Sequence, residues 1–122
     1  MAAPNIVAVT SIYGKSLGAA LSTTVTTDIL TCPSNKVLKV NSIIVANVDG
    51  SSSADATVYF YDNSASTRYQ IASTVAVPAD TSLVILDKNN SMYLEESEPI
   101  EAGASASGDL VITISYEEID DA

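Results

Sequence analysis

The sequence predicts an all-β protein: a single antiparallel β-sandwich of about eight strands, with jelly-roll-like topology. Short apolar runs alternate with turn-forming residues at the spacing of sandwiches and barrels. Ser, Thr, Ala, Val and Ile dominate, and β-branched side chains suit a pleated, half-buried surface. Strong helix formers are sparse until the C-terminal end. The 122 residues suit one domain, residues 1–122.

The first half of the chain offers four strand candidates. Residues 6–12 form the first candidate, and we expect Gly14 and Gly18 to end it. Residues 1–12 are predicted to be a short N-terminal arm. Residues 21–31 fit a helical face too, but their threonines crowd a helix backbone and favour a strand. Residues 37–48 form the longest candidate. In residues 57–61, Val58 and Phe60 share one face, and Tyr59 and Tyr61 share the other.

The second half adds residues 68–77, 83–86 and 92–94, a weaker stretch around Ile100, and a small-residue loop at 103–108. Residues 110–117 alternate most clearly, with Leu110, Ile112, Ile114 and Tyr116 facing inward. Residues 118–122 are predicted to be a frayed acidic tail.

The alternation in residues 37–48 places Leu38, Val40, Ile44 and Val48 on one face, which leaves Ile43 and Val45 on the other. Ile43 and Val45, together with Val84 and Leu86, are more apolar residues than one inner sheet face needs. No helix is predicted to cover an outer sheet face. We therefore expect a homo-oligomer. The alternative is that they lie at sandwich edges or beneath loops. The candidate interface residues are Ile6, Val7, Val9, Ile12, Ile43, Val45, Tyr59, Tyr61, Val84 and Leu86. Tyr59, Tyr61, Tyr69 and Tyr93 could instead form a carbohydrate-stacking face.

The formal net charge of −10 argues against nucleic-acid partners and anionic membranes. The chain has no long apolar run and its N-terminus lacks secretory-signal features, so we expect folding in a cytoplasm. The lone Cys32 is then a reduced, apolar residue.

No catalytic motif is complete. The chain has no histidine, which excludes Ser-His-Asp and Cys-His arrangements. A nucleophile elbow would need glycine where Ser107 stands, and a phosphate loop would need glycine where Val9 stands. Glu96 and Glu98 would share a strand face, but no Trp platform accompanies them, so a solvated acidic edge or a calcium site is the better reading. We expect no enzyme, no catalytic residue and no cofactor.

Three stretches carry a family resemblance: residues 1–7 before a Gly-Lys turn; residues 39–47; and residues 77–88, continuing through Tyr93-Leu94-Glu95-Glu96 to residues 114–119. Together they resemble small virion structural proteins of tailed bacteriophages, especially marine and cyanobacterial ones. The resemblance transfers no catalytic residue. It implies a non-enzymatic protein assembled in the host cytoplasm. The acidic surface of the present chain suits the outside of a capsid.

The main expectation from this resemblance is a capsid decoration (cement) protein, with a trimer favoured, that binds the major capsid protein or another virion protein. Alternatives are a neck, tail or fibre component of the particle, and a lectin-like module that binds glycans.

Overall fold

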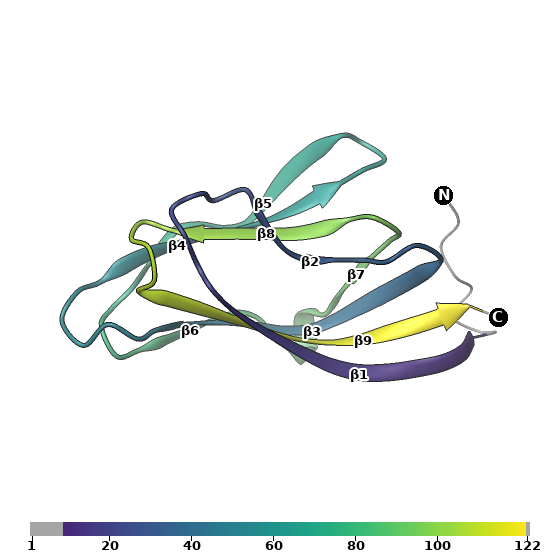
Figure 1. The fold of residues 1–122 in the computed structure, drawn as a ribbon, viewed down its shortest axis with the longest axis horizontal. Coiled ribbons are helices and arrows are strands. Elements are labelled where there is room, and N and C mark those ends of the chain that lie inside the picture. The colour runs from purple at the N-terminus through teal and green to yellow at the C-terminus, as the bar shows by residue number, and fades with distance from the viewer. Residues whose placement is uncertain (1–8, 122) are drawn as a thin grey trace.

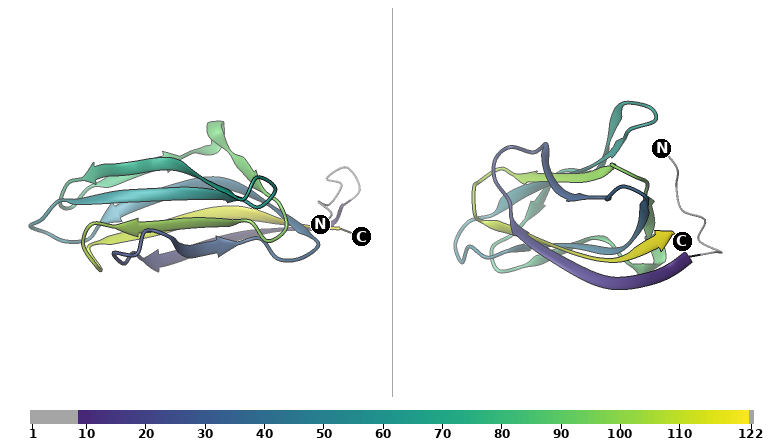
Figure 2. Two further views of the ribbon diagram at one scale, coloured as in Figure 1. Left: turned by 90° about the horizontal axis from the view of Figure 1, so that it is seen from above. Right: turned by 45° about the vertical axis from the view of Figure 1, so that its right-hand side comes forward.

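The computed structural model describes residues 9–121, and the side chains of residues 11–120. Over this range, nine strands form two antiparallel sheets that pack face to face as a sandwich (Figure 1). The two layers are also visible when the molecule is turned (Figure 2). The predicted all-β sandwich is confirmed.

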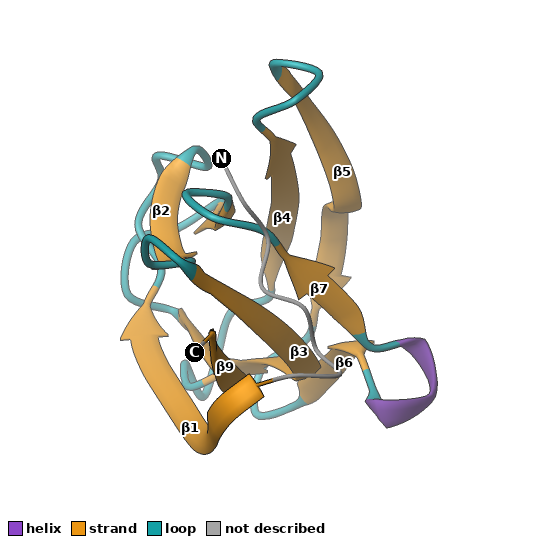
Figure 3. Ribbon diagram, turned by 90° about the vertical axis from the view of Figure 1, so that its right-hand side faces the viewer, coloured by secondary structure: helices purple, strands orange, loops and turns teal. Residues whose placement is uncertain are grey.

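Sheet A contains five strands and sheet B four. In sheet A the order is β1 (Val9–Ala20), β9 (Leu110–Asp121), β3 (Lys36–Asn47) and β6 (Ser82–Leu86), and β7 (Met92–Leu94) also pairs with β3. In sheet B the order is β2 (Thr27–Thr31), β8 (Pro99–Ala104), β4 (Ala54–Asp62) and β5 (Thr67–Val77). A short 3-10 helix, η1 (Lys88–Asn90), lies between β6 and β7 (Figure 3).

The strand pairing is nested along the chain. β1 pairs with β9, β2 with β8, β3 with β6, and β4 with β5, and successive pairs alternate between the two sheets. A long hairpin folded over itself in this way is a jelly roll, as the sequence predicts. The short β7, which the sequence predicts at residues 92–94, is a ninth strand beside the eight of the jelly roll.

The core lies between the sheets. Large aliphatic side chains of sheet A face smaller ones of sheet B, an arrangement that lets the two layers interdigitate. On β9, Leu110, Ile112 and Ile114 are buried as predicted, while Tyr116 is partly buried against the core. The sheet-B contribution includes Ala54, Ala56, Val58, Ile100, Ala102 and Ala104.

A bulge in β3 changes which residues of this strand face the core. Val40 pairs with Tyr116 and Ser42 pairs with Ser115, so Asn41 is the extra residue. The alternation therefore shifts by one position, and Ile43 and Val45 are buried while Ile44 and Val48 are exposed. The predicted outward placement of Ile43 and Val45 was wrong, because strict alternation was carried across this bulge.

Residues 9–12 and 118–121 are more ordered than predicted. β1 continues through Gly14 and Gly18 because its backbone pairs with β9 along the whole strand. Residues 9–12 of the predicted arm thus belong to β1, and residues 1–8 lie outside the described range. The prediction of a frayed tail over 118–122 was also wrong for residues 118–121, which pair with β1 and β3 and include the buried Glu118 and Ile119. Ala122 is not described.

The predicted loop at 103–108 begins later than expected, because β8 includes Gly103 and Ala104. Within the predicted strand 21–31, only Thr27–Thr31 is a strand, and the preceding segment packs over Gly103. A Cβ at Gly103 would lie 2.8 Å from the backbone nitrogen of Val25 and 2.9 Å from the carbonyl oxygen of Thr24. Glycine is therefore required at this close approach of two backbones.

Candidate interaction surfaces

The outer face of sheet A is a broad uncharged surface. Three paired rows define it: Ser16–Ser115–Ser42, Gly18–Thr113–Ile44–Val84 and Ala20–Val111–Ala46–Ser82. These eleven residues, exposed or half-buried, include no charged side chain and are called the neutral face below. Ile44 and Val84, which pair with each other, are 36% and 56% exposed. In a chain with a net charge of −10, a surface of this kind is where another subunit can approach without facing charge.

Charged groups gather beside the neutral face rather than on it. Lys39 pairs with Glu117 in the next row, and the Asn41 side chain donates to Glu117 Oε2 at 3.3 Å. On the opposite, core-facing side of the same strands, Glu118 Oε2 lies 3.2 Å from Lys15 Nζ and 3.4 Å from Lys36 Nζ. These ion pairs compensate the charge of Glu118, which would otherwise oppose the packing of β1, β3 and β9.

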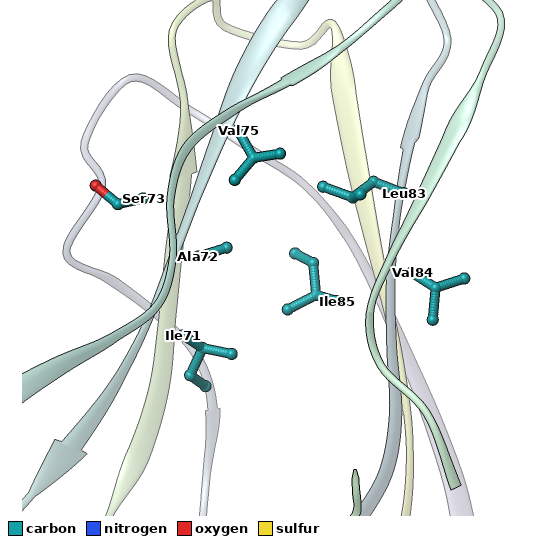
Figure 4. Close-up of a pocket in the computed structure, with 7 residues that line it drawn as sticks. All are labelled: Ile71, Ala72, Ser73, Val75, Leu83, Val84 and Ile85. Carbon is teal, nitrogen blue, oxygen red and sulfur yellow. The ribbon is translucent and has the colours of Figure 1, made fainter. Parts of the chain in front are cut away.

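An apolar groove lies between the edge strands of the two sheets. Its volume is about 310 Å³, and β5 and β6 line it with Ile71, Ala72, Ser73, Val75, Leu83, Val84 and Ile85. In Figure 4, Val75, Leu83 and Ile85 point into the space between the strands, whereas Ser73 points away. β5 and β6 form no ladder with each other, so the sandwich is open on this side.

The outer face of sheet B is polar and carries an ion pair. Arg68 on β5 donates from Nε to Glu101 Oε1 on β8, and its guanidinium lies 5.6 Å and 5.3 Å from the ring centres of Tyr59 and Tyr61. Glu101 is only 5% exposed. The pKa of Asp28, next to Glu101 in the ladder, is raised by desolvation and then by a hydrogen bond with Glu101 and its charge, while Arg68 lowers it.

The predicted tyrosine surface is divided in the structure. Tyr59 and Tyr61 lie beneath Arg68, Tyr69 pairs with Phe60 on the opposite face of the same hairpin, and Tyr93 belongs to sheet A. The four rings do not form one platform for a sugar.

Glu96 and Glu98 do not share a strand face, because they lie in the turn between β7 and β8. Glu98 is buried and accepts hydrogen bonds from the backbone nitrogens of Glu95 at 3.0 Å and Asn63 at 3.3 Å. Burial raises the pKa of Glu98, and these two bonds oppose the shift. Glu96 accepts from the backbone nitrogen of Asn35. These carboxylates thus stabilise turns by accepting backbone hydrogen bonds. Within the described part of the chain, no cluster of residues could hold a metal ion.

Cys32 is a buried thiol whose sulfur lies 3.2 Å from the carbonyl oxygen of Lys36. Burial raises the pKa of Cys32 to about 11. The thiol is therefore protonated and unreactive at neutral pH.

The predicted interface residues have different positions in the structure. Ile43, Val45 and Leu86 are core residues, so their assignment to an interface was wrong. Ile12 and Val84 are exposed, and Tyr59 and Tyr61 are half-buried. Val9 begins β1, but its side chain is not described, and Ile6 and Val7 lie outside the described residues.

The sequence reasoning missed Ile44 and the β5 side of the groove. The signal for Ile44 was present, since its strand holds more apolar residues than one face can take. Locating the bulge, however, required the pairing with β9.

Comparisons with known proteins give little further information. No protein-family model and no curated protein matches the sequence. Among solved structures, the chain is similar to one from the virus-like particle of the extra small virus of the giant freshwater prawn Macrobrachium rosenbergii. The identity is 12%, the TM-score is 0.44, and the match covers 92% of this chain and 80% of the other. A likeness this distant carries no argument about function. No helix in residues 9–121 has the length and hydropathy to cross a membrane.

Proposed function

We propose that this protein is a non-enzymatic structural subunit of a virus particle, and specifically a capsid decoration protein on the outer surface of a tailed-phage head. The neutral face of sheet A is the observation that carries the proposal. It presents an exposed, uncharged sheet surface, in which serine and threonine hydroxyls alternate with small and aliphatic side chains, on an otherwise acidic protein. Such a surface suits repeated contact with another subunit.

The charge and the fold support the same role. A net charge of −10 is unfavourable beside packaged DNA, so the outer surface of a head is the better location. The jelly roll is an architecture that viral capsid proteins use, although lectins use it too, so this support is by analogy. The sequence resemblance to small virion proteins of tailed phages points the same way.

The proposed mechanism is linkage by mass action. A protein that binds only the assembled shell stabilises that shell relative to its dissociated subunits. The neutral face would contact the major capsid protein where capsid subunits meet. A homo-trimer assembled in the host cytoplasm would place three such faces at one junction.

The copy number in purified particles tests the proposal. Quantitative mass spectrometry against the major capsid protein should give a number comparable with the capsid subunits. A handful of copies would instead indicate the neck, tail or fibre. Absence from the particle would refute a virion role and favour the glycan-binding alternative, which a glycan array would then test.

A matched pair of variants tests the surface. Ile44→Asp places a charge in the neutral face, and we expect it to weaken binding to undecorated capsids about tenfold or more. Tyr69→Asp adds the same charge at an exposed apolar residue of sheet B and should bind as the unmodified protein does. Equal binding by both variants would rule out the neutral face as the capsid-binding surface.

A further inference from the structure

We propose that the apolar groove between β5 and β6 holds residues 1–8 of a second copy of this chain. The proposal concerns contact between copies of the protein and does not depend on the virion role. It rests on the chemistry of the groove, the chemistry of the segment, and the distance between them.

The groove requires an uncharged apolar occupant. None of its seven lining residues is charged, although the chain carries fifteen acidic side chains. Ile71, Leu83 and Ile85 pack partly against the core, and Val75 and Val84 remain exposed. Apolar surface left open along the side of a sandwich is favourable to cover.

Residues 1–8 match this requirement in composition. The segment Met-Ala-Ala-Pro-Asn-Ile-Val-Ala contains no charged side chain, and Ile6 and Val7 are β-branched residues suited to an extended backbone. An uncharged segment is also the part of this acidic protein that a second acidic copy repels least.

Distance excludes the groove of the same chain. β1 begins at Val9, which pairs with Asp121. This is the end of sheet A at which β3 starts, at Lys36. The groove residue Val84 pairs instead with Ile44, further along β3. Figure 1 shows the start of β1 and β6 toward opposite ends of the molecule. The offset along β3 is about 26 Å, and the offset across three strand spacings is about 14 Å, so the straight-line separation is about 30 Å.

Residues 1–8 span at most about 28 Å when fully extended. Ile6 and Val7, three and two residues before Val9, extend only about 10 Å from it, so these two apolar side chains fall well short of the groove of their own chain. A groove on another copy carries no such restriction, so the occupant we assign is the segment of a neighbouring molecule.

Cysteine crosslinking tests the contact directly in the purified full-length protein. A Val7→Cys chain is mixed with a differently tagged Val75→Cys chain and oxidised, and we expect a disulfide between the two tags. Ala65→Cys, at the exposed β4–β5 turn, replaces Val75→Cys as the matched control and should link at least tenfold more slowly. The buried Cys32 does not compete.

The mass in solution supplies an independent readout. By sedimentation, the unmodified protein should have a multiple of its 12.7 kDa chain mass. Ile6→Asp/Val7→Asp and Val75→Asp should each weaken association about 100-fold, whereas Tyr69→Asp should not. Equal crosslinking of Val75→Cys and Ala65→Cys, or an oligomer unaffected by both the segment and groove variants, would overturn the proposal. A monomeric unmodified protein would overturn it as well.

Discussion

At the residue scale, Arg68 is the chain's only arginine, and it compensates a carboxylate that has little access to water. Glu101 is buried under the outer surface of sheet B, next to Asp28. Arg68 also covers the faces of Tyr59 and Tyr61, so its removal affects both charge and packing.

We expect Arg68→Met to destabilise the protein, because Glu101 would be left buried beside another carboxylate. Adding Glu101→Gln should restore part of that loss, since the uncompensated charge is then absent. Urea unfolding of the two single variants and the double variant measures the coupling. A double variant less stable than Arg68→Met would contradict this account of Glu101.

Asp28 gives a pH-dependent prediction. Its pKa in the folded protein is raised above the ordinary 3.8, so its contribution to stability is fully present below pH 3.8 and is lost as pH rises through the raised value. Asp28→Asn should therefore raise the melting temperature at pH 7, and the gain should disappear below about pH 3.8. Asp80→Asn removes the same charge at an exposed turn and is the control. A gain independent of pH would argue against this linkage.

At the element scale, the sequence pattern predicts burial only where the ladder is regular. The alternation of β9 correctly places Leu110, Ile112 and Ile114 in the core. The same rule fails in β3, because the additional residue Asn41 depends on pairing with a strand some 75 positions later, which local periodicity cannot detect. Ile43 and Val45 were consequently assigned to an interface instead of the core.

The bulge can be tested by comparing a deletion with a substitution. Removing Asn41 would place Val40 next to Ser42, opposite the adjacent partners Tyr116 and Ser115, so Ile43 and Val45 should still face the core and we expect the shortened protein to fold. Asn41→Ala keeps the register and removes only the hydrogen bond to Glu117, which should cost about 1 kcal/mol. Circular dichroism during thermal unfolding compares the two, and an unfolded deletion variant beside a folded Asn41→Ala would show that β3 needs the bulge itself.

Two glycines in sheet strands should respond in opposite ways to alanine. Gly103→Ala should destabilise by about 1–3 kcal/mol or more, because the new methyl group meets the backbone of Val25 and Thr24. Gly18→Ala finds no close neighbour besides the Ile112 carbonyl oxygen at 4.0 Å, so it should be neutral or stabilising by up to about 1 kcal/mol. Urea denaturation gives both values. Equal effects would show that the contact over Gly103 relaxes easily.

At the scale of the whole molecule, composition and turn spacing were sufficient to predict an all-β sandwich, because they report local preference and the burial of one sheet face. The jelly roll was only its favoured version, since the number of strands does not fix how they connect. Composition and turn spacing could not predict the groove, which exists only once β5 and β6 are brought to the same side of the sandwich. The neutral face is likewise a property of strand order, since its rows combine β1, β9, β3 and β6.

The overall charge predicts how association depends on salt. Two copies with a net charge of −10 repel each other, while the proposed contacts are uncharged. Raising the ionic strength from about 0.01 M to about 0.15 M shortens the screening length from about 30 Å to about 8 Å, and self-association should become tighter. Sedimentation at the two salt concentrations measures the change. Weaker association at higher salt would indicate that ion pairs, rather than neutral surfaces, hold the copies together.

The pairing of Val9 with Asp121 places the beginning of β1 next to the end of β9. Tension applied between these two points would open the ladder one residue pair at a time, like a zipper, and this is the mechanically weak direction of an antiparallel pair. A load applied across the sheets through the neutral face would instead be shared by several strands at once. For the proposed role in a virus shell, the direction in which neighbours pull on this protein would therefore matter as much as how tightly they hold it.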